Sequence, residues 1–384
     1  MVNVDISNIW SALSLPELLE IEQEVSAAHP APEAGAFRPC SSGELLRLIA
    51  VAERLRGGSE DCVVVGGGNC ALAARAAVEL LQGRERNLTR DQAGDPRIFF
   101  AGYSFSTRQW NHLKAQLEGK CFSVIVLSGP ELAPEAAVTL RNLKWMLDRR
   151  YSTDEANARI CAVTHPEEGP LAEMARLHSW ELIPLDSGTG FDALSPAALL
   201  PMAVAGLDVA GMLAGAEESR EALELRSFEN PLWLYAAVRE LLRRRGRKTE
   251  LLAAWEPDFH AFGRWWQRQF FPAGAPVIPG EASMAHPGLF VTAVRFEPSG
   301  QSSAIPSDVH DTDGLNVLSG RSLEAVQEEM FLETLDAWTD SGIPVLTMDC
   351  GPLDEQSLGH LFYFLRQGSS LSARLTGHTR HPEE

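Results

Sequence analysis

Short apolar runs alternate with helix-like segments along the first half of the chain. Five runs hold mostly apolar residues, which is typical of strands that a parallel sheet buries on both faces. They lie at residues 61–65, 97–101, 122–127, 160–164 and 181–185. The segments between them carry apolar residues at helical spacing. This alternation predicts a parallel sheet with helices on both faces, an α/β architecture in which the turn after residue 65 lies at a carboxyl end.

The chain before this alternation is expected to be helical. One helix opens behind Ser14, with Pro16 and Glu17 in its first turn, and a second covers residues 41–58 and stops at two glycines. The segment 27–40 between them is rich in Pro, Ala and Gly, so it is expected to be a loop.

The second half shows a similar but less regular alternation, which again predicts an α/β arrangement. The segments expected as strands are 249–255, 289–297 and 343–349, and those expected as helices are 260–271, 322–342 and 354–377. The stretch 273–288 is rich in Pro, Gly and Ala, so it is expected to be an irregular loop.

Charge excludes two classes of partner. The 384 residues include 33 Lys and Arg against 52 Asp and Glu, which gives a net charge of −19. A charge of this sign repels nucleic acid and anionic membrane surfaces. The longest apolar stretch, residues 193–216, is interrupted by Pro196, Pro201 and Asp208, which favours buried helices over a membrane span.

The compartment and cofactors follow from what the sequence lacks. The N-terminus has no basic region followed by an apolar one, and the six scattered cysteines are typical of free core thiols, so a cytoplasmic protein is expected. His310, with Asp311 and Asp313 after it, and the histidines at 378 and 381 lack a complete ligand set at a recognised spacing. We therefore expect neither a metal nor a cofactor.

A glycine-rich turn follows the first apolar run and opens a helix. It reads Gly66, Gly67, Gly68, Asn69, Cys70 and Ala71. The spacing fits the dinucleotide fingerprint G-x-G-x-x-A, but the second run ends without the acidic residue that would hold a ribose. Two interpretations stay open. The turn either binds an anion through backbone N–H groups at a helix N-terminus, or it is only a tight connection between a strand and a helix.

Several segments resemble the bacterial branch of the glucose-6-phosphate isomerase family. The matches are collinear from about residue 60 to 375. The segments and the family motifs they resemble are 229–239 (ENP…YAAIR), 255–266 (YEPSLHYFAEWW), 199–208 (LLPIAVAGID), 313–316 (DGLN), 339–344 (HTDGGVP) and 354–364 (DE..FGYLVYFF). The resemblance implies two sugar isomerase (SIS) domains, each a parallel sheet flanked by helices, and the homodimer that is usual in the family.

The resemblance also sets the expected domain boundaries. A helical N-terminal segment would cover residues 1–57, a first SIS domain residues 58–217, and a second, C-terminally shortened SIS domain residues 218–384. The lysine near the C-terminus of the family has no counterpart in this sequence.

The family interconverts an aldose and a ketose through an enediolate, and its phosphate loop is altered here. The family motif S-K-S-G-T-T-T-E falls on the segment that begins Ser128-Gly129 and ends at Glu135. Its three threonines become Leu, Ala and Pro; Pro130 and Pro134 have no N–H to donate, and Glu131 adds a repelling charge.

The groups that act on the sugar carbons are altered as well. The arginine of the family motif G-G-R-F becomes Gly190, and the motif of the catalytic glutamate should follow Phe271, where the chain instead reads Pro-Ala-Gly. The nearest acid is Glu281, and the resemblance matches His286 to the active-site histidine of the family. Glu281 and His286 are therefore the candidate catalytic residues.

These observations leave three functional hypotheses. The first is a degenerate homologue that binds or regulates; the second is an active glucose-6-phosphate isomerase of glycolysis and gluconeogenesis; the third is altered chemistry that uses Cys70, Glu135 or His286. In each case we expect a sugar or sugar-phosphate ligand. The candidate substrate-binding residues are Gly66, Gly67, Gly68, Asn69, Cys70, Ser128, Gly129 and Glu135.

Overall fold

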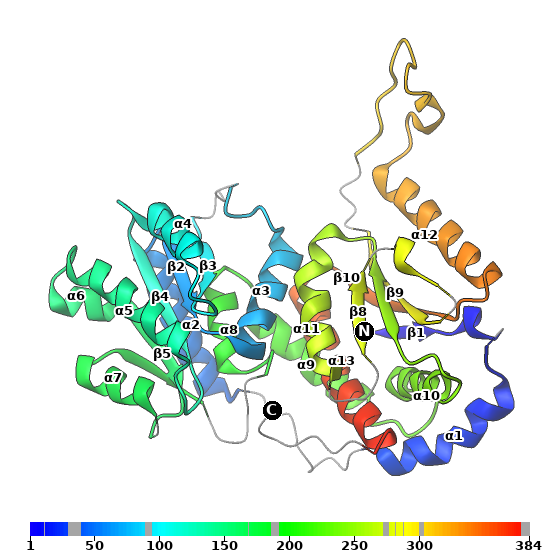
Figure 1. Ribbon diagram of the computed structural model, residues 1–384, viewed down its shortest axis with the longest axis horizontal. Helices are drawn as coiled ribbons and strands as arrows, with labels where there is room; N and C mark the ends of the chain where they lie inside the picture. Colours follow the sequence, from blue (N-terminus) through cyan, green and yellow to red (C-terminus); the bar gives the residue numbers. More distant parts are fainter. Residues whose placement is uncertain are drawn as a thin grey trace. The chain divides into compact units, whose positions relative to one another are not determined.

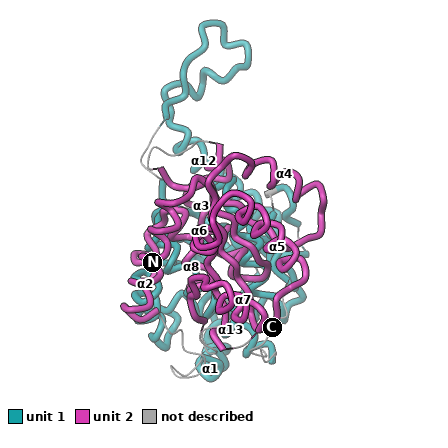
Figure 2. Tube along the Cα trace, turned by 90° about the vertical axis from the view of Figure 1, so that its left-hand side faces the viewer, with its two compact units in different colours: residues 1–31, 214–384 teal, residues 32–213 magenta. Residues whose placement is uncertain are grey.

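The computed structural model divides the chain into two compact units (Figures 1 and 2). Unit 1 comprises residues 1–31 and 214–384, and unit 2 comprises residues 32–213. The residues that the structure leaves undescribed are 11, 30–39, 89–93, 168, 186–191, 272–275, 281, 287, 299–302 and 378–384. The domain boundaries expected after residues 57 and 217 stay predictions, because a division by contacts does not test which segments fold independently.

Unit 2 is built on a parallel five-stranded sheet in the order β3-β2-β4-β5-β6. The strands are β2 (Asp61–Val65), β3 (Arg97–Ala101), β4 (Phe122–Leu127), β5 (Ile160–Thr164) and β6 (Glu181–Pro184). Their positions and parallel pairing confirm the expectation from the apolar runs. Every residue of β2, β4 and β5 is buried, which explains why these strands are apolar throughout instead of alternating.

Helices cover both faces of this sheet (Figure 1). On one face α4 (Thr107–Leu117), α5 (Pro134–Asp148), α6 (Thr153–Ala158) and α7 (Pro170–His178) pack in one apolar core with alternate residues of β2, β4 and β5. On the other face α2 (Ser42–Gly57) and α3 (Gly68–Gln82) pack against α8 (Pro196–Val204).

Unit 1 holds a second five-stranded sheet, in the order β1-β10-β9-β7-β8. Its parallel strands are β7 (Glu250–Ala254), β8 (Val277–Gly280), β9 (Phe290–Glu297) and β10 (Val345–Pro352). The short strand β1 (Asn3–Asp5) pairs antiparallel with β10 at the edge.

Two expectations were wrong in this unit. The stretch 273–288, expected to be an irregular loop, contains β8, and the N-terminal region, expected to be helical, begins with β1. Both are short edge strands. β8 includes a proline and a glycine, which an edge strand tolerates because one of its sides makes no ladder hydrogen bonds.

The helix expected behind Ser14 and those expected at residues 260–271, 322–342 and 354–377 are present in unit 1, and two further helices occur between residues 209 and 244. α1 (Leu15–Ala28), α10 (Pro231–Arg244) and α13 (Glu355–Leu375) pack together, and α11 (His260–Phe270) packs on α13. α12 (Leu323–Asp340) shares an apolar core with β7, β9 and β10. α9 (Val209–Ala222) runs across the boundary between the units, and the 3-10 helices are η1 (Ser7–Ile9), η2 (Pro257–Phe259), η4 (Ala282–Met284) and η5 (Asn316–Leu318). Among the described residues, none of these helices is long and apolar enough to cross a membrane.

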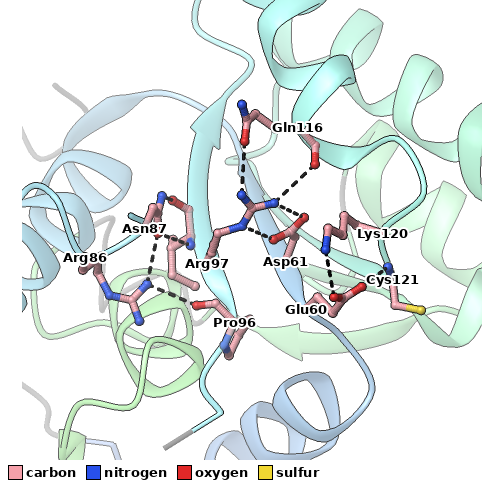
Figure 3. A network of polar contacts seen from close by, with 10 residues as sticks. Glu60, Asp61, Arg86, Asn87, Pro96, Arg97, Gln116, Lys120 and Cys121 are labelled. Carbon is pink, nitrogen blue, oxygen red and sulfur yellow. Dashed lines mark hydrogen bonds and ion pairs between the residues drawn. The ribbon is translucent and has the colours of Figure 1, made fainter. Parts of the chain in front are cut away.

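A network of polar contacts links the amino ends of β2 and β3 (Figure 3). The Arg97 guanidinium donates to both carboxylate oxygens of the fully buried Asp61, at 2.6 and 2.9 Å. Beside it, the Asn87 side chain donates to the Ile98 carbonyl at 2.8 Å and accepts from the Ile98 N–H at 3.0 Å. Asn87 thereby satisfies backbone groups of β3, the strand at the edge of the sheet.

An arm projects from unit 1 between β9 and α12 (Figure 1). Residues 303–305 pair with residues 320–323 at its base. At its tip, the Asn316 amide donates to the Asp308 carbonyl at 2.7 Å, and the Asn316 N–H donates to the Asp311 carboxylate at 2.9 Å. Val309 is 96% exposed, so the shape of the arm depends on its own hydrogen bonds.

Candidate functional site at the carboxyl edge of the unit 2 sheet

The strand order of unit 2 predicts where a ligand would bind. β2 and β4 are neighbours in the sheet. The connection after β2 leads to β3 on one side of this pair, whereas the connection after β4 leads to β5 on the other side. In open α/β sheets, ligands bind outside the carboxyl ends of strands at such a switch point. The turn at residues 66–70 follows β2 and the loop at residues 128–135 follows β4, so both lie at this edge. The carboxyl-end position expected for the glycine turn is confirmed.

The glycine turn is shaped by close backbone contacts. Gly66 has a φ of +141°, and a Cβ added to it would lie 2.5 Å from the Leu127 carbonyl oxygen. Gly67 and Gly68 are exposed, and α3 begins at Gly68. The turn thus presents bare backbone at a helix N-terminus, where N–H groups lack partners within the helix.

The next two residues of the turn point into unit 2. Cys70 is fully buried, with its Sγ 3.5 Å from the Asp192 carbonyl oxygen and 3.6 Å from the Ser195 hydroxyl. Burial raises the pKa of the Cys70 thiol well above its usual range, so it stays protonated and unreactive. The Asn69 Oδ1 is buried and lacks a hydrogen-bond partner within the described part of the chain. A substrate-binding role for either side chain stays a prediction.

The loop after β4 uses its own hydroxyl internally. Ser128 is buried, and its Oγ lies 3.0 Å from the Gly129 carbonyl oxygen and 2.9 Å from the Glu131 carbonyl oxygen, to which it donates. The Thr164 hydroxyl also donates to the Gly129 carbonyl, at 3.5 Å. These contacts hold the loop in shape, but they occupy the hydroxyls that an anion would need.

Two carboxylates lie in and beside the same loop. Glu131 is exposed, and Glu135 is half-buried in the first turn of α5, which begins at Pro134. Negative side chains at this place interact favourably with the positive end of the helix dipole. They would also repel a phosphate dianion.

The candidate catalytic pair is only partly described. Glu281 lies outside the described residues, as do Gly190 and the Pro-Ala-Gly segment that follows Phe271. His286 is exposed in unit 1, and its Nδ1 accepts a hydrogen bond from the Gly288 N–H at 3.0 Å. The catalytic roles of Glu281 and His286 stay predictions. Among the described residues, no three His, Cys, Asp or Glu side chains gather as metal ligands would.

The loop after β3 is a part of this edge that the sequence analysis did not identify as a candidate site. Tyr103 and Phe105 lie on this loop with 51% and 63% of their surface exposed, and a Cβ added to Gly67 would lie 3.9 Å from the Tyr103 Cβ. The segment lacks the acidic residue that a dinucleotide site needs at this place. Two aromatic side chains that follow a strand without helical spacing are the signal that could have identified it.

Unit 1 has a switch point of the same kind. β7 lies between β8 and β9, and Trp255 and Glu256 follow its carboxyl end. Trp255 packs edge-on against Phe331 at 4.8 Å between ring centroids. Burial raises the pKa of Glu256 above its usual range, although its carboxylate accepts a hydrogen bond from the Asp258 N–H.

Fold and site together define the class of protein: an α/β protein with two sheets, in each of which four parallel strands follow the same order and the first of them lies between the second and the third. No family model matches the chain. Curated proteins do match it. The chain is 35% identical to a glucose-6-phosphate isomerase of Enterococcus faecalis and 33% identical to one of Clostridioides difficile, and each match covers 87% of this chain and 79% of the relative. The chain belongs to the glucose-6-phosphate isomerase family, and its two sheets are those of two SIS domains.

Solved structures agree with this fold. A hypothetical protein of Thermus thermophilus superposes with a TM-score of 0.79 at 18% identity, over 98% of this chain and 94% of that one. A glucose-6-phosphate isomerase of Chlamydia trachomatis gives a TM-score of 0.73 at 16% identity, over 92% of this chain and 74% of that one.

Proposed function

We propose that the protein is a sugar-binding or regulatory member of its family that does not interconvert glucose 6-phosphate and fructose 6-phosphate. The observation that carries the proposal is the loop after β4. Its one remaining serine hydroxyl is directed at two carbonyl oxygens of the same loop, and two of its residues are prolines. A phosphate dianion needs several donors aimed at its oxygens, because its hydration shell must be replaced on binding.

Sequence supports the same proposal at the carbon atoms of the sugar. The family motif with the catalytic glutamate is absent after Phe271, and the family arginine is replaced by Gly190. Proton transfer between C1 and C2 needs a base within hydrogen-bond reach, and the enediolate needs a positive group beside it. The loss of one such preorganised group costs on the order of a hundredfold in rate, and two roles are vacant here.

A coupled dehydrogenase assay with fructose 6-phosphate tests the proposal. We expect no turnover above background by the purified protein, and no tight binding of fructose 6-phosphate by calorimetry. The Enterococcus faecalis relative, run under the same conditions, serves as the positive control. Turnover of about 10 per second, a typical enzyme value, would overturn the proposal. So would micromolar affinity that is lost on Ser128→Ala substitution.

The names of the curated relatives favour a second candidate, an active glucose-6-phosphate isomerase acting in glycolysis and gluconeogenesis. In that case the segment around residues 281–286 would supply a rebuilt site. The same assay separates the two candidates, because Glu281→Gln or His286→Ala would then abolish a measurable turnover. In neither case do the residues call for a cofactor, and we propose the cytoplasm as the compartment.

We further propose that the protein acts as a homodimer. The projecting arm of unit 1 supports this proposal, because its tip is held in a defined shape while Val309 and Val317 are 96% and 79% exposed. Solvent-exposed apolar side chains on a projecting segment of defined shape are typical of a protein–protein contact.

A further inference from the structure

The loop after β3 holds an exposed tyrosine in a fixed orientation. The Tyr103 hydroxyl accepts a hydrogen bond from the Gln109 side-chain amide in α4. The oxygen of that amide accepts in turn from the Ser104 hydroxyl at 2.7 Å, and the Gln109 N–H donates to the Ser106 hydroxyl at 3.3 Å. An exposed side chain with free rotation would lose entropy on binding a ligand, and this anchoring reduces that loss.

The Tyr103 side chain starts beside bare backbone. The Gly66 N–H donates to the Ala101 carbonyl at 3.0 Å, which joins the glycine turn to the end of β3. Gly67, next to the Tyr103 Cβ, carries no side chain, and a Cβ added to Gly68 would meet no atom within 4 Å. The edge of the sheet therefore offers exposed peptide groups next to the residue that carries the aromatic ring.

Acidic groups border this place. A Cβ added to Gly102 would lie 3.2 Å from the Ala136 Cα, so the base of the loop touches the first turn of α5, which carries Glu135. Glu131 lies in the adjoining loop after β4. The nearest cation along the chain is the exposed Arg108 at the start of α4. Carboxylates accept hydrogen bonds from hydroxyl groups and repel phosphate.

We propose that Tyr103 and Phe105 form a stacking platform for the ring of an uncharged hexose at the switch point of unit 2. This deepens the proposed function and rests on it. The apolar C–H face of a sugar ring packs on an aromatic side chain, while the hydroxyls at its rim pair with peptide N–H groups and carboxylates. The platform thus replaces the phosphate as the anchor of the ligand.

Sugar binding by single-residue variants tests the platform. We would titrate fructose and fructose 6-phosphate by calorimetry, with saturation-transfer NMR to locate the sugar protons in contact with the protein. For fructose we expect Tyr103→Ala to raise Kd roughly tenfold, the effect of losing one stacked ring. Tyr103→Phe keeps the ring, so its Kd for fructose should stay within about threefold of that of the unchanged protein.

The matched control is Trp145→Ala, since Trp145 is also exposed, at 57%, but lies on α5 stacked with Arg149. It should leave the Kd for fructose unchanged. Circular dichroism confirms that each variant is folded.

Three results would overturn the platform: no fructose binding at millimolar concentration, equal affinity of Tyr103→Ala and the unchanged protein, or fructose 6-phosphate binding more than tenfold tighter than fructose. The second leaves the proposed binding function intact. Isomerase turnover, by contrast, would overturn the proposed function whatever the Tyr103 variants show.

Discussion

Asp61 carries a carboxylate inside the core of unit 2 because Arg97 pairs with both of its oxygens. The register of β2 and β3 sets Asp61 directly opposite Arg97, so the two side chains meet at the first residue of each strand (Figure 3). Hydrogen bonding to Asp61 raises the pKa of the Arg97 guanidinium. A buried charge is stable only while its partner remains, so each residue depends on the other.

Removing one partner should therefore destabilise unit 2 strongly. We expect Arg97→Met to lower the free energy of unfolding by about 3–5 kcal/mol, measured by urea denaturation. Lys144→Met is the control, because the Lys144–Asp148 pair lies on the surface of α5 and contributes about 0.3–0.5 kcal/mol. Equal losses in the two variants would contradict a special role for the buried pair.

At the same scale, the sequence identified the glycine turn but not the direction of its side chains. Gly66 to Cys70 stood out because glycines followed an apolar run, yet the first turn of a helix can present a given residue either to solvent or to the core. The structure buries Cys70 against Asp192 and Ser195, residues more than 120 positions away. A contact of that sequence separation leaves no trace in the local pattern.

Among the elements, predictability followed length and burial. The central strands β2, β4 and β5 were predicted because such strands of a parallel sheet are apolar on both faces, and the edge strands β3 and β6 because their runs are also mostly apolar. β1 and β8 have only three and four residues, too few to show a strand pattern, and pairing with β10 and β7 decides their structure. Tertiary contacts override local propensity in both cases.

The turn from β2 into α3 gives a prediction at this scale. Gly66→Ala should destabilise unit 2 by at least about 1–3 kcal/mol, because an alanine disfavours the positive φ and its Cβ would overlap the Leu127 carbonyl. Gly43→Ala in α2 is the matched control: an added Cβ there meets nothing within 4 Å, so a gain of about 0.5 kcal/mol is expected. Thermal unfolding measures both, and a neutral Gly66→Ala would show that the turn can rearrange.

For the molecule as a whole, the arm of unit 1 is the feature on which the proposed homodimer depends. The proposed homodimer would bury Val309 and Val317, each worth about 1.5 kcal/mol when fully buried. Nothing in the sequence distinguished these valines from core residues; only the projection of the arm from the body of unit 1 does so (Figure 1).

Charged residues at the tip should weaken the dimer. We expect the chain to sediment as a dimer and the double variant Val309→Asp, Val317→Asp to raise the dissociation constant at least tenfold, roughly the loss of one buried valine. Leu177→Asp controls for added charge, because Leu177 is 78% exposed on α7 in unit 2. A monomeric unchanged protein, or a double variant that dimerises equally well, would contradict the proposal.

The way the units divide the chain also sets an order of events during synthesis. Unit 2 is one continuous segment, residues 32–213, so all of its strands have left the ribosome before most of unit 1 is made. Strand β1 pairs with β10, some 340 residues further on, so β1 remains without its sheet partner until β10 has been translated. A growing chain therefore carries all the strands of unit 2 while β1 is still unpaired, and contacts of such long range form slowly. In newly made molecules, the unpaired edges of β1 and β10 are therefore where association with a wrong partner is most expected.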